Sequence, residues 1–172
     1  MELPPANNNH QQKESNMRLN EIKTINDACR KVGVDYESFL AMIEHLPEHL
    51  QALAAMEIII KALNDGWVNP LDGLTRVWYP WVYVYDKYEQ ERMEKMYPDR
   101  EDLIRFTRPD GSCGLAYAYS NYAWSLSSAH VGSRLAMKSE TVCLYFIRNF
   151  KDLLAQYILP MEDCNILEKY SR

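Results

Sequence analysis

The stretch Val77–Tyr85 reads V-W-Y-P-W-V-Y-V-Y and decides the fold class, because it carries the clearest strand signal in the chain. β-Branched and aromatic residues dominate it and no residue in it is charged, which is typical of a β-strand. Alternation along a strand places every second residue on one face. Pro80 lacks an N–H, which favours an edge position or a bulge over a central strand. Both faces are apolar enough to need cover from other elements.

Helical patterns precede this strand. A first short helix ends at Val32, where Gly33 follows as a C-terminal cap. Asp35 caps a second short helix. Pro47 fits the first turn of a third, longer helix that runs to about Asn64 and carries a wide apolar arc.

Further strand signals follow the aromatic stretch. Lys87–Met96 is dense in charge and predicts a solvated helix or an extended hairpin arm. Leu103–Thr107 predicts a short strand. Gly114–Leu126 alternates twice, with a turn expected near Ser120 and Asn121, and Val131–Lys138 alternates again.

A final helix begins after Ser139 and ends at Pro160. The order of helices, then strands, then one helix indicates the α+β class rather than alternating βαβ units. We expect an N-terminal helical cluster, an antiparallel sheet of about four to five strands, and a long C-terminal helix packed on the sheet. The helical cluster is expected at the other face of the sheet or at an end.

The 172 residues fit one domain of ordinary size. We expect a disordered tail at 1–17, a single α+β domain at 18–160 and a C-terminal tail at 161–172. The polar start of the chain carries no secretory signal, and no apolar run approaches the roughly 18 residues that span a bilayer. The predicted location is cytoplasmic.

Charge and cysteine content narrow the function classes. The formal net charge is −5, and none of the segments 1–66, 67–138 and 139–172 is net positive. This charge distribution disfavours non-specific binding to nucleic acid or an anionic membrane. The four cysteines show no C-x-x-C spacing and are interpreted as free thiols of a reducing compartment.

Candidate chemistry is sparse. Cys113 with His130 as its base would make a nucleophile, but their spacing does not imply contact. His45 and His49 are four residues apart, yet Pro47 interrupts the helix that would align them as metal ligands. Phosphate-binding glycine motifs are absent. We therefore predict no catalytic residue, no metal ligand and no cofactor.

The segment Thr24–Phe39 has the outline of a helix-turn-helix. Its second helix would present Asp35, Glu37 and Glu44 and no Lys or Arg, a face that repels phosphates. A DNA-associated regulator using the N-terminal helices stays open as an alternative, as does an enzyme of unrecognised type.

Aromatic density offers the remaining candidate. The chain has 12 tyrosines and 4 tryptophans, which can form a stacking platform on a sheet face, although core packing accounts for most such residues. Arg134 is expected on a strand, with a structural carboxylate as its partner. The candidate binding surface comprises Trp81, Tyr83, Tyr117, Tyr122, Trp124 and Arg134.

Four stretches together resemble a family of uncharacterised proteins found in gut bacterial genomes and their phages and prophages. They are A-C-R-K-V-G-V (Ala28–Val34), A-L-N-D-G-W (Ala62–Trp67), W-Y-P-W (Trp78–Trp81) and V-G-S-R-L-A-M-K-S (Val131–Ser139). The resemblance spans roughly Ile22–Leu159 and implies a mobile-element protein with a structural or accessory role. It supplies no catalytic residues.

The sequence therefore favours a non-enzymatic binding or structural protein of phage or mobile-element origin. We expect a protein partner or self-association, and we do not expect nucleic acid, a membrane or a metal.

Overall fold

The computed structural model describes residues 19–97, 103–108, 110, 112–125 and 133–159. The tails predicted at 1–17 and 161–172, and His130, lie outside these ranges. The described residues form five α-helices, one 3-10 helix and three strands. They are α2 (Ile25–Val32), α3 (Tyr36–Ile43), α4 (Glu48–Asn64), β1 (Arg76–Val84), α5 (Lys87–Met96), β2 (Leu103–Thr107), β3 (Cys113–Trp124), η1 (Ser133–Leu135) and α6 (Glu140–Ile158).

Local capping chemistry sets the helix boundaries. Gly33 ends α2 in the left-handed region at φ 73°, where a residue without a Cβ is not strained. The Asp35 side chain accepts from Ser38 N and begins α3, and the Ser139 side chain accepts from Val142 N and begins α6. These predicted caps are confirmed. Lys87–Met96 takes the helical alternative, because Asp86 supplies a capping box.

The sheet is antiparallel with the strand order β1-β3-β2. The prediction of four to five strands was wrong, because Cys113–Trp124 is one continuous strand. Ser120 and Asn121 make no turn; they lie opposite Pro80 and Tyr79 in a register that runs on to Arg76 and Trp124. Pairing along the whole of β1 outweighs the local turn preference of these two residues.

The prediction of a strand over Val131–Lys138 is also wrong for residues 133–138, which are the part of this range that the structure describes. Its residues form η1 and a single bridge, in which Met137 and Trp78 exchange hydrogen bonds of 2.9 and 3.0 Å. On the opposite side the Asn64 side chain donates to Ala136 O at 2.8 Å and accepts from Lys138 N at 3.1 Å. The Asn64 side chain thus forms the hydrogen bonds with Ala136 O and Lys138 N that a further strand would have formed.

Pro80 lies on an edge strand, as its missing N–H predicted. Trp78 bonds Met137 on the side away from β3, whereas Tyr85 N donates to Leu115 of β3. The even-numbered residues of β1 therefore direct their backbone N–H and C=O groups away from β3. Pro80 is one of them, so its ring costs no hydrogen bond to β3.

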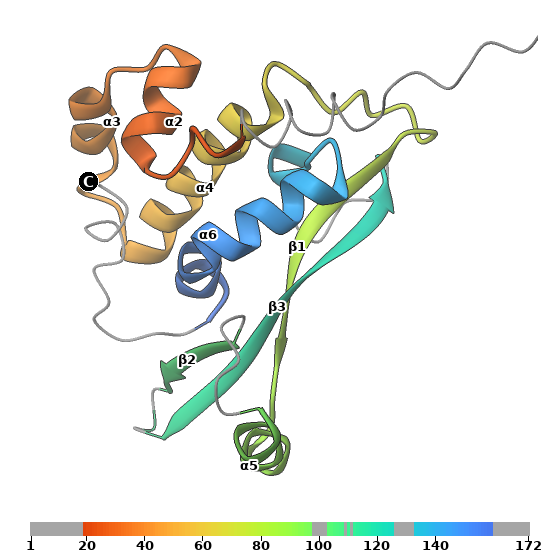
Figure 1. The fold of residues 1–172 in the computed structure, drawn as a ribbon. Helices are drawn as coiled ribbons and strands as arrows, with labels where there is room; N and C mark the ends of the chain where they lie inside the picture. The colour runs from red at the N-terminus through yellow and green to blue at the C-terminus, as the bar shows by residue number, and fades with distance from the viewer. Residues whose placement is uncertain (1–18, 98–102, 109, 111, 126–132, 160–172) are drawn as a thin grey trace, which may run out of the picture.

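Apart from α5, the described helices stack on one side of the sheet. α5 packs on the opposite face, where Met93 joins Leu103 and Leu115. α6 packs on the face that carries Trp78, Val82 and Ala118, and α4 packs on α6 from the other side. α2 packs in turn on α4 (Figure 1). The expected long C-terminal helix on the sheet is confirmed, but the helical cluster lies behind that helix rather than on the other face or at an end.

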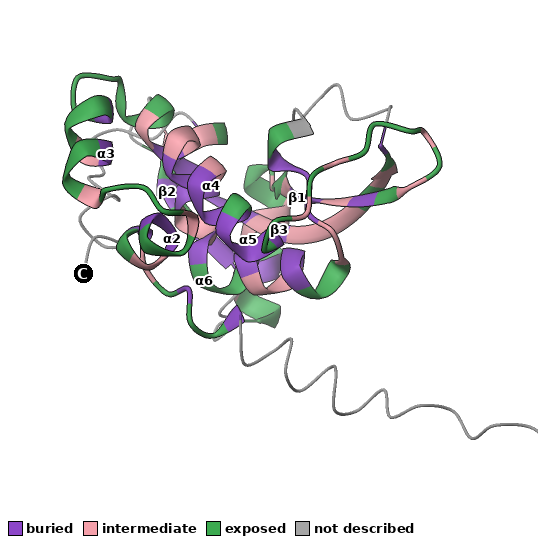
Figure 2. Cartoon of the chain, turned by 90° about the horizontal axis from the view of Figure 1, so that it is seen from above, coloured by how far each residue is buried: buried purple, intermediate pink, exposed green. Residues whose placement is uncertain are grey.

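This arrangement follows from the apolar arcs of the two long helices. Both α4 and α6 are buried over more than one side, so each needs two neighbours. Figure 2 shows the buried residues concentrated along these helices. None of the described helices combines the length and the apolar composition that a bilayer crossing requires.

Candidate functional site

The structure divides the predicted binding surface among three places. Tyr117 and Tyr122 belong to one continuous strand and are separated by an odd number of residues, so they lie on opposite faces. Trp81, Tyr83 and Tyr117 lie on the face opposite α6. Tyr122 and Trp124 lie on the α6 face, at the far end of the sheet. Arg134 lies on η1 instead of a strand.

The face opposite α6 carries two cross-strand aromatic pairs. Trp81 is opposite Tyr119, and Tyr83 is opposite Tyr117. Tyr117 and Tyr119 also stack along β3, with ring centroids 5.8 Å apart and planes 13° apart. We call Trp81, Tyr83, Tyr117 and Tyr119 the aromatic tile. Tyr119 was missing from the predicted surface, although its alternation with Tyr117 placed it on the same face.

Small apolar clusters flank the tile at both ends. Trp81 packs against the cluster of Val77, Tyr79 and Ala136. Tyr117 packs against the cluster at α5, which is formed by Met93, Leu103 and Leu115. Both ends are therefore held by burial, while Tyr83, opposite Tyr117 at the α5 end, keeps 48% of its surface exposed. The tile is a supported surface rather than a set of loose rings.

Acidic residues border the tile beside α5. Tyr83 OH lies 3.3 and 3.4 Å from the carboxylate oxygens of Glu89, to which it donates. The negative charge of Glu89 raises the pKa of Tyr83, and the charge of Asp86 adds to this effect. The phenol therefore stays protonated and acts as a hydrogen-bond donor at neutral pH.

The remaining aromatic pair is occupied by a side chain of the protein itself. The Arg76 guanidinium lies 4.3 Å from the ring centroid of Tyr122 and 5.6 Å from that of Trp124. Trp78 lies against Tyr122 with ring centroids 5.5 Å apart. These rings are already paired with a cation, so they are a weaker candidate for an external ligand than the tile.

Arg134 has the structural carboxylate partner that the sequence predicted. Its Nη1 lies 3.7 Å from Glu57 Oε2 of α4. The side chain is 82% exposed, so the ion pair contributes little to stability. Arg134 also borders an apolar groove that runs along α4.

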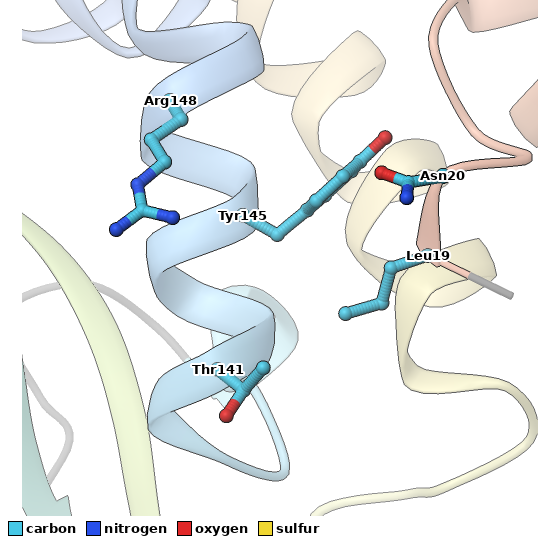
Figure 3. Close-up of a pocket in the computed structure, with 5 residues that line it drawn as sticks. All are labelled: Leu19, Asn20, Thr141, Tyr145 and Arg148. Carbon is cyan, nitrogen blue, oxygen red and sulfur yellow. The ribbon is translucent and has the colours of Figure 1, made fainter. Parts of the chain in front are cut away.

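A smaller pocket of about 250 Å³ lies where residues 19 and 20 meet α6 (Figure 3). Tyr145 points toward Asn20, and its OH donates to Ile22 O at 2.8 Å. Burial raises the pKa of Tyr145, as does the charge of Asp27. Arg148 extends away from Tyr145 (Figure 3), so the polar groups of this pocket do not converge on one point.

The candidate nucleophile pair is only half described, and the described residues hold no cluster of metal ligands. Cys113 is exposed at the start of β3, and its candidate base His130 lies outside the described ranges. Burial raises the pKa of the Cys143 thiol to about 12, and burial also raises the pKa of Cys29. Within the described ranges, no three histidine, cysteine or acidic side chains are grouped as metal ligands.

The geometry of the site is the principal guide to function, because known proteins offer no match. No protein-family model, no curated protein and no solved structure matches the chain.

Proposed function

We propose that the protein acts by binding a protein partner, with the aromatic tile at the centre of the contact. The observation that carries this proposal is the pairing of Trp81 with Tyr119 and of Tyr83 with Tyr117 on the sheet face opposite α6. The flanking clusters hold Trp81 and Tyr117. Tyr119 stacks on Tyr117, and the Tyr83 hydroxyl donates to Glu89. A partner would therefore meet a preorganised surface and lose little side-chain entropy on binding.

The chemistry of the tile suits a protein partner. Tyrosine and tryptophan are enriched in protein interfaces, because each buries a large apolar area and adds a polar group. Tyr83 supplies a hydroxyl donor, and the Glu89 carboxylate beside it forms a polar rim. The acidic rim supports a protein over a nucleic acid, because Asp86 and Glu89 would repel phosphates.

The alternative of a DNA-associated regulator gains no support from the N-terminal helices. α2 and α3 form the expected corner through Gly33. However, α3 begins with the carboxylates of Asp35 and Glu37 and has no basic residue in its last turn. We therefore do not assign DNA reading to this corner.

The biological setting is part of the same proposal. The resemblance of Ala28–Val34, Ala62–Trp67, Trp78–Trp81 and Val131–Ser139 to proteins of gut bacteria and their phages supports an accessory protein of a mobile element. In that setting the partner is another protein encoded by the element or its host, or a second copy of this chain.

Site-specific photocrosslinking tests the proposal. A photoreactive phenylalanine replaces Tyr83 in one variant and Tyr88 in a matched control, since Tyr88 is 76% exposed on α5 and lies outside the tile. We expect position 83 to give a discrete protein adduct in cells and position 88 to give none. Mass spectrometry then identifies the partner, including a second copy.

Affinity measurements with the purified partner complete the test. Tyr83→Asp should weaken binding by at least about tenfold, and Tyr88→Asp by less than about twofold. Circular dichroism verifies that both variants are folded. Equal effects of the two substitutions, or no adduct specific to position 83, would refute the assignment of the tile.

A further inference from the structure

We propose that a second surface, the groove along α4, binds an amphipathic α-helix with acidic flanks from a partner protein. The groove shares no residue with the aromatic tile, so this inference does not depend on the function proposed for the tile. It has a volume of about 700 Å³. Residues of α2, α3, α4, η1 and the segment after α4 line it.

One face of α4 forms the floor of the groove. Ala54, Glu57, Ile58, Lys61 and Asn64 have the three- and four-residue spacing of a single helix face. The walls come from the corner of α2 and α3 and from the segment after α4 together with η1. At 1.5 Å per residue the floor from Ala54 to Asn64 is about 15 Å long.

Exposed apolar side chains gather on the rim of this groove. Val68 is 79% exposed, Met42 65%, Leu71 49% and Val34 37%. Single exposed apolar residues are common on protein surfaces, but several around one apolar trough mark a contact site. The rim therefore offers area that a partner can bury.

The shape of the groove favours a helix over other occupants. Small-molecule sites enclose about 70–90% of their ligand, whereas rim residues as exposed as Val68 and Met42 describe an open trough. A partner strand would gain no ladder hydrogen bonds, because helices, a loop and η1 line the groove and no sheet edge does. A helix satisfies its own backbone and presents apolar residues at i, i+3, i+4 and i+7. About three turns of helix match the 15 Å floor.

The charges of the groove favour acidic flanks on that helix. Glu57 on the floor lies 3.7 Å from Arg134 on the rim. Among the described residues, no carboxylate pairs with the exposed Lys61 side chain. The net charge of the lining is therefore positive, and a helix with glutamate or aspartate beside its apolar stripe complements it.

A display selection against the full chain provides the test. The library encodes helical peptides whose stripe varies among Leu, Ile, Met and Phe and whose flanks vary among Glu, Ser and Lys. We expect the enriched peptides to carry acidic flanks. In fluorescence anisotropy, their affinity should fall at least about tenfold with Val68→Asp and change less than about twofold with Leu74→Asp. Leu74 is a matched control, because it is 82% exposed and does not line the groove.

A second substitution tests the charge argument separately. Lys61→Glu should reverse the preference from acidic to basic flanks, while Lys87→Glu on α5 should leave it unchanged. Failure to enrich any striped peptide, or equal sensitivity to Val68→Asp and Leu74→Asp, would overturn the proposal. So would a wild-type dimer in sedimentation that Val68→Asp dissociates, or nuclear Overhauser contacts from Val68 to residues 1–18 or 160–172 of the same chain. Results at Tyr83 bear only on the tile, so the two proposals can fail independently.

Discussion

Single side chains secure the irregular parts of this fold, and Asn64 is the main example. It is 5% exposed at the end of α4, and its amide bonds both Ala136 O and Lys138 N. Asn64→Ala would leave these two backbone groups unpaired and should cost about 2 kcal/mol. Urea unfolding measures the difference.

Asn149→Ala is the control for that measurement, because the Asn149 side chain bonds Tyr145 O in an exposed position. It should change the free energy of unfolding by less than about 0.5 kcal/mol. An Asn64→Ala variant as stable as this control would show that Asn64 does not hold the segment after η1.

Asp72 organises the loop before β1 in a way that depends on pH. Its carboxylate accepts from Leu74 N at 2.9 Å, from Thr75 N at 2.8 Å and from Ser125 Oγ at 2.9 Å. The hydrogen bonds from Thr75 and Leu74 hold the pKa of Asp72 well below its usual range. Because the folded pKa is lowered, the stabilisation is complete above the ordinary pKa near 4 and is lost as the pH falls further.

We therefore expect Asp72→Asn to lower the melting temperature at pH 7. The difference from wild type should shrink as the pH falls from about 4 to 2. Thermal unfolding by circular dichroism across this range measures it. A difference that stays constant down to pH 2 would contradict the assignment.

At the scale of the element, Gly114 in β3 supports a close aromatic contact. A Cβ at this position would lie 2.5 Å from Cζ of the Phe106 ring on β2, its cross-strand neighbour. Gly114→Ala should therefore destabilise the protein by about 1–3 kcal/mol through overpacking. Combining it with Phe106→Leu should recover part of the loss in urea unfolding, and a stable Gly114→Ala protein would contradict the contact.

Elements whose signals are local could be predicted from the sequence. The caps at Asp35 and Ser139, the stop at Gly33 and the edge preference of Pro80 each depend on a few neighbouring atoms. The continuity of β3 could not be predicted in this way. It depends on pairing Ser120 and Asn121 with a strand about 40 residues earlier in the chain.

The same long-range pairing explains the errors in the candidate site. Once β3 is continuous, alternation separates Tyr117 from Tyr122 and adds Tyr119 to the tile. The cation–π contacts of Arg76 and the groove along α4 had no local signal, because they join segments that are distant in sequence. Arg134 was correctly expected to have a carboxylate partner, since an arginine beside small residues commonly pairs with one.

For the molecule as a whole, α6 is the layer shared by the sheet and by α4. Trp78, Trp81 and Trp124 belong to the sheet, and Trp67 packs against it, so tryptophan fluorescence reports on the sheet. Circular dichroism at 222 nm reports mainly on the helices. Because α6 belongs to the core of both layers, the two urea transitions should coincide.

Phe146→Ala in the centre of α6 provides a direct check. Phe146 is fully buried, and its truncation should cost about 3–5 kcal/mol. Both transitions should move together to lower urea. Separate midpoints for fluorescence and circular dichroism would show that the sheet and the helical layer unfold independently.

The exposed edge of β1 also affects whether copies of this chain can pair strand to strand at high concentration. Eight of the nine residues in Val77–Tyr85 are β-branched or aromatic and none is charged, a composition that favours fibril growth where no proline interrupts it. The outward edge of β1 nevertheless leaves little backbone for another strand to pair with. The backbone N–H and C=O of Trp78 are already bonded to Met137, and Pro80 has no backbone N–H to donate. Of the even-numbered residues of β1, Arg76, Val82 and Val84 are left to recruit another strand. Trp78 and Pro80 separate Arg76 from the other two, so no continuous template is long enough for stacking. A stretch with the composition of a fibril core can thus remain in a discrete folded molecule.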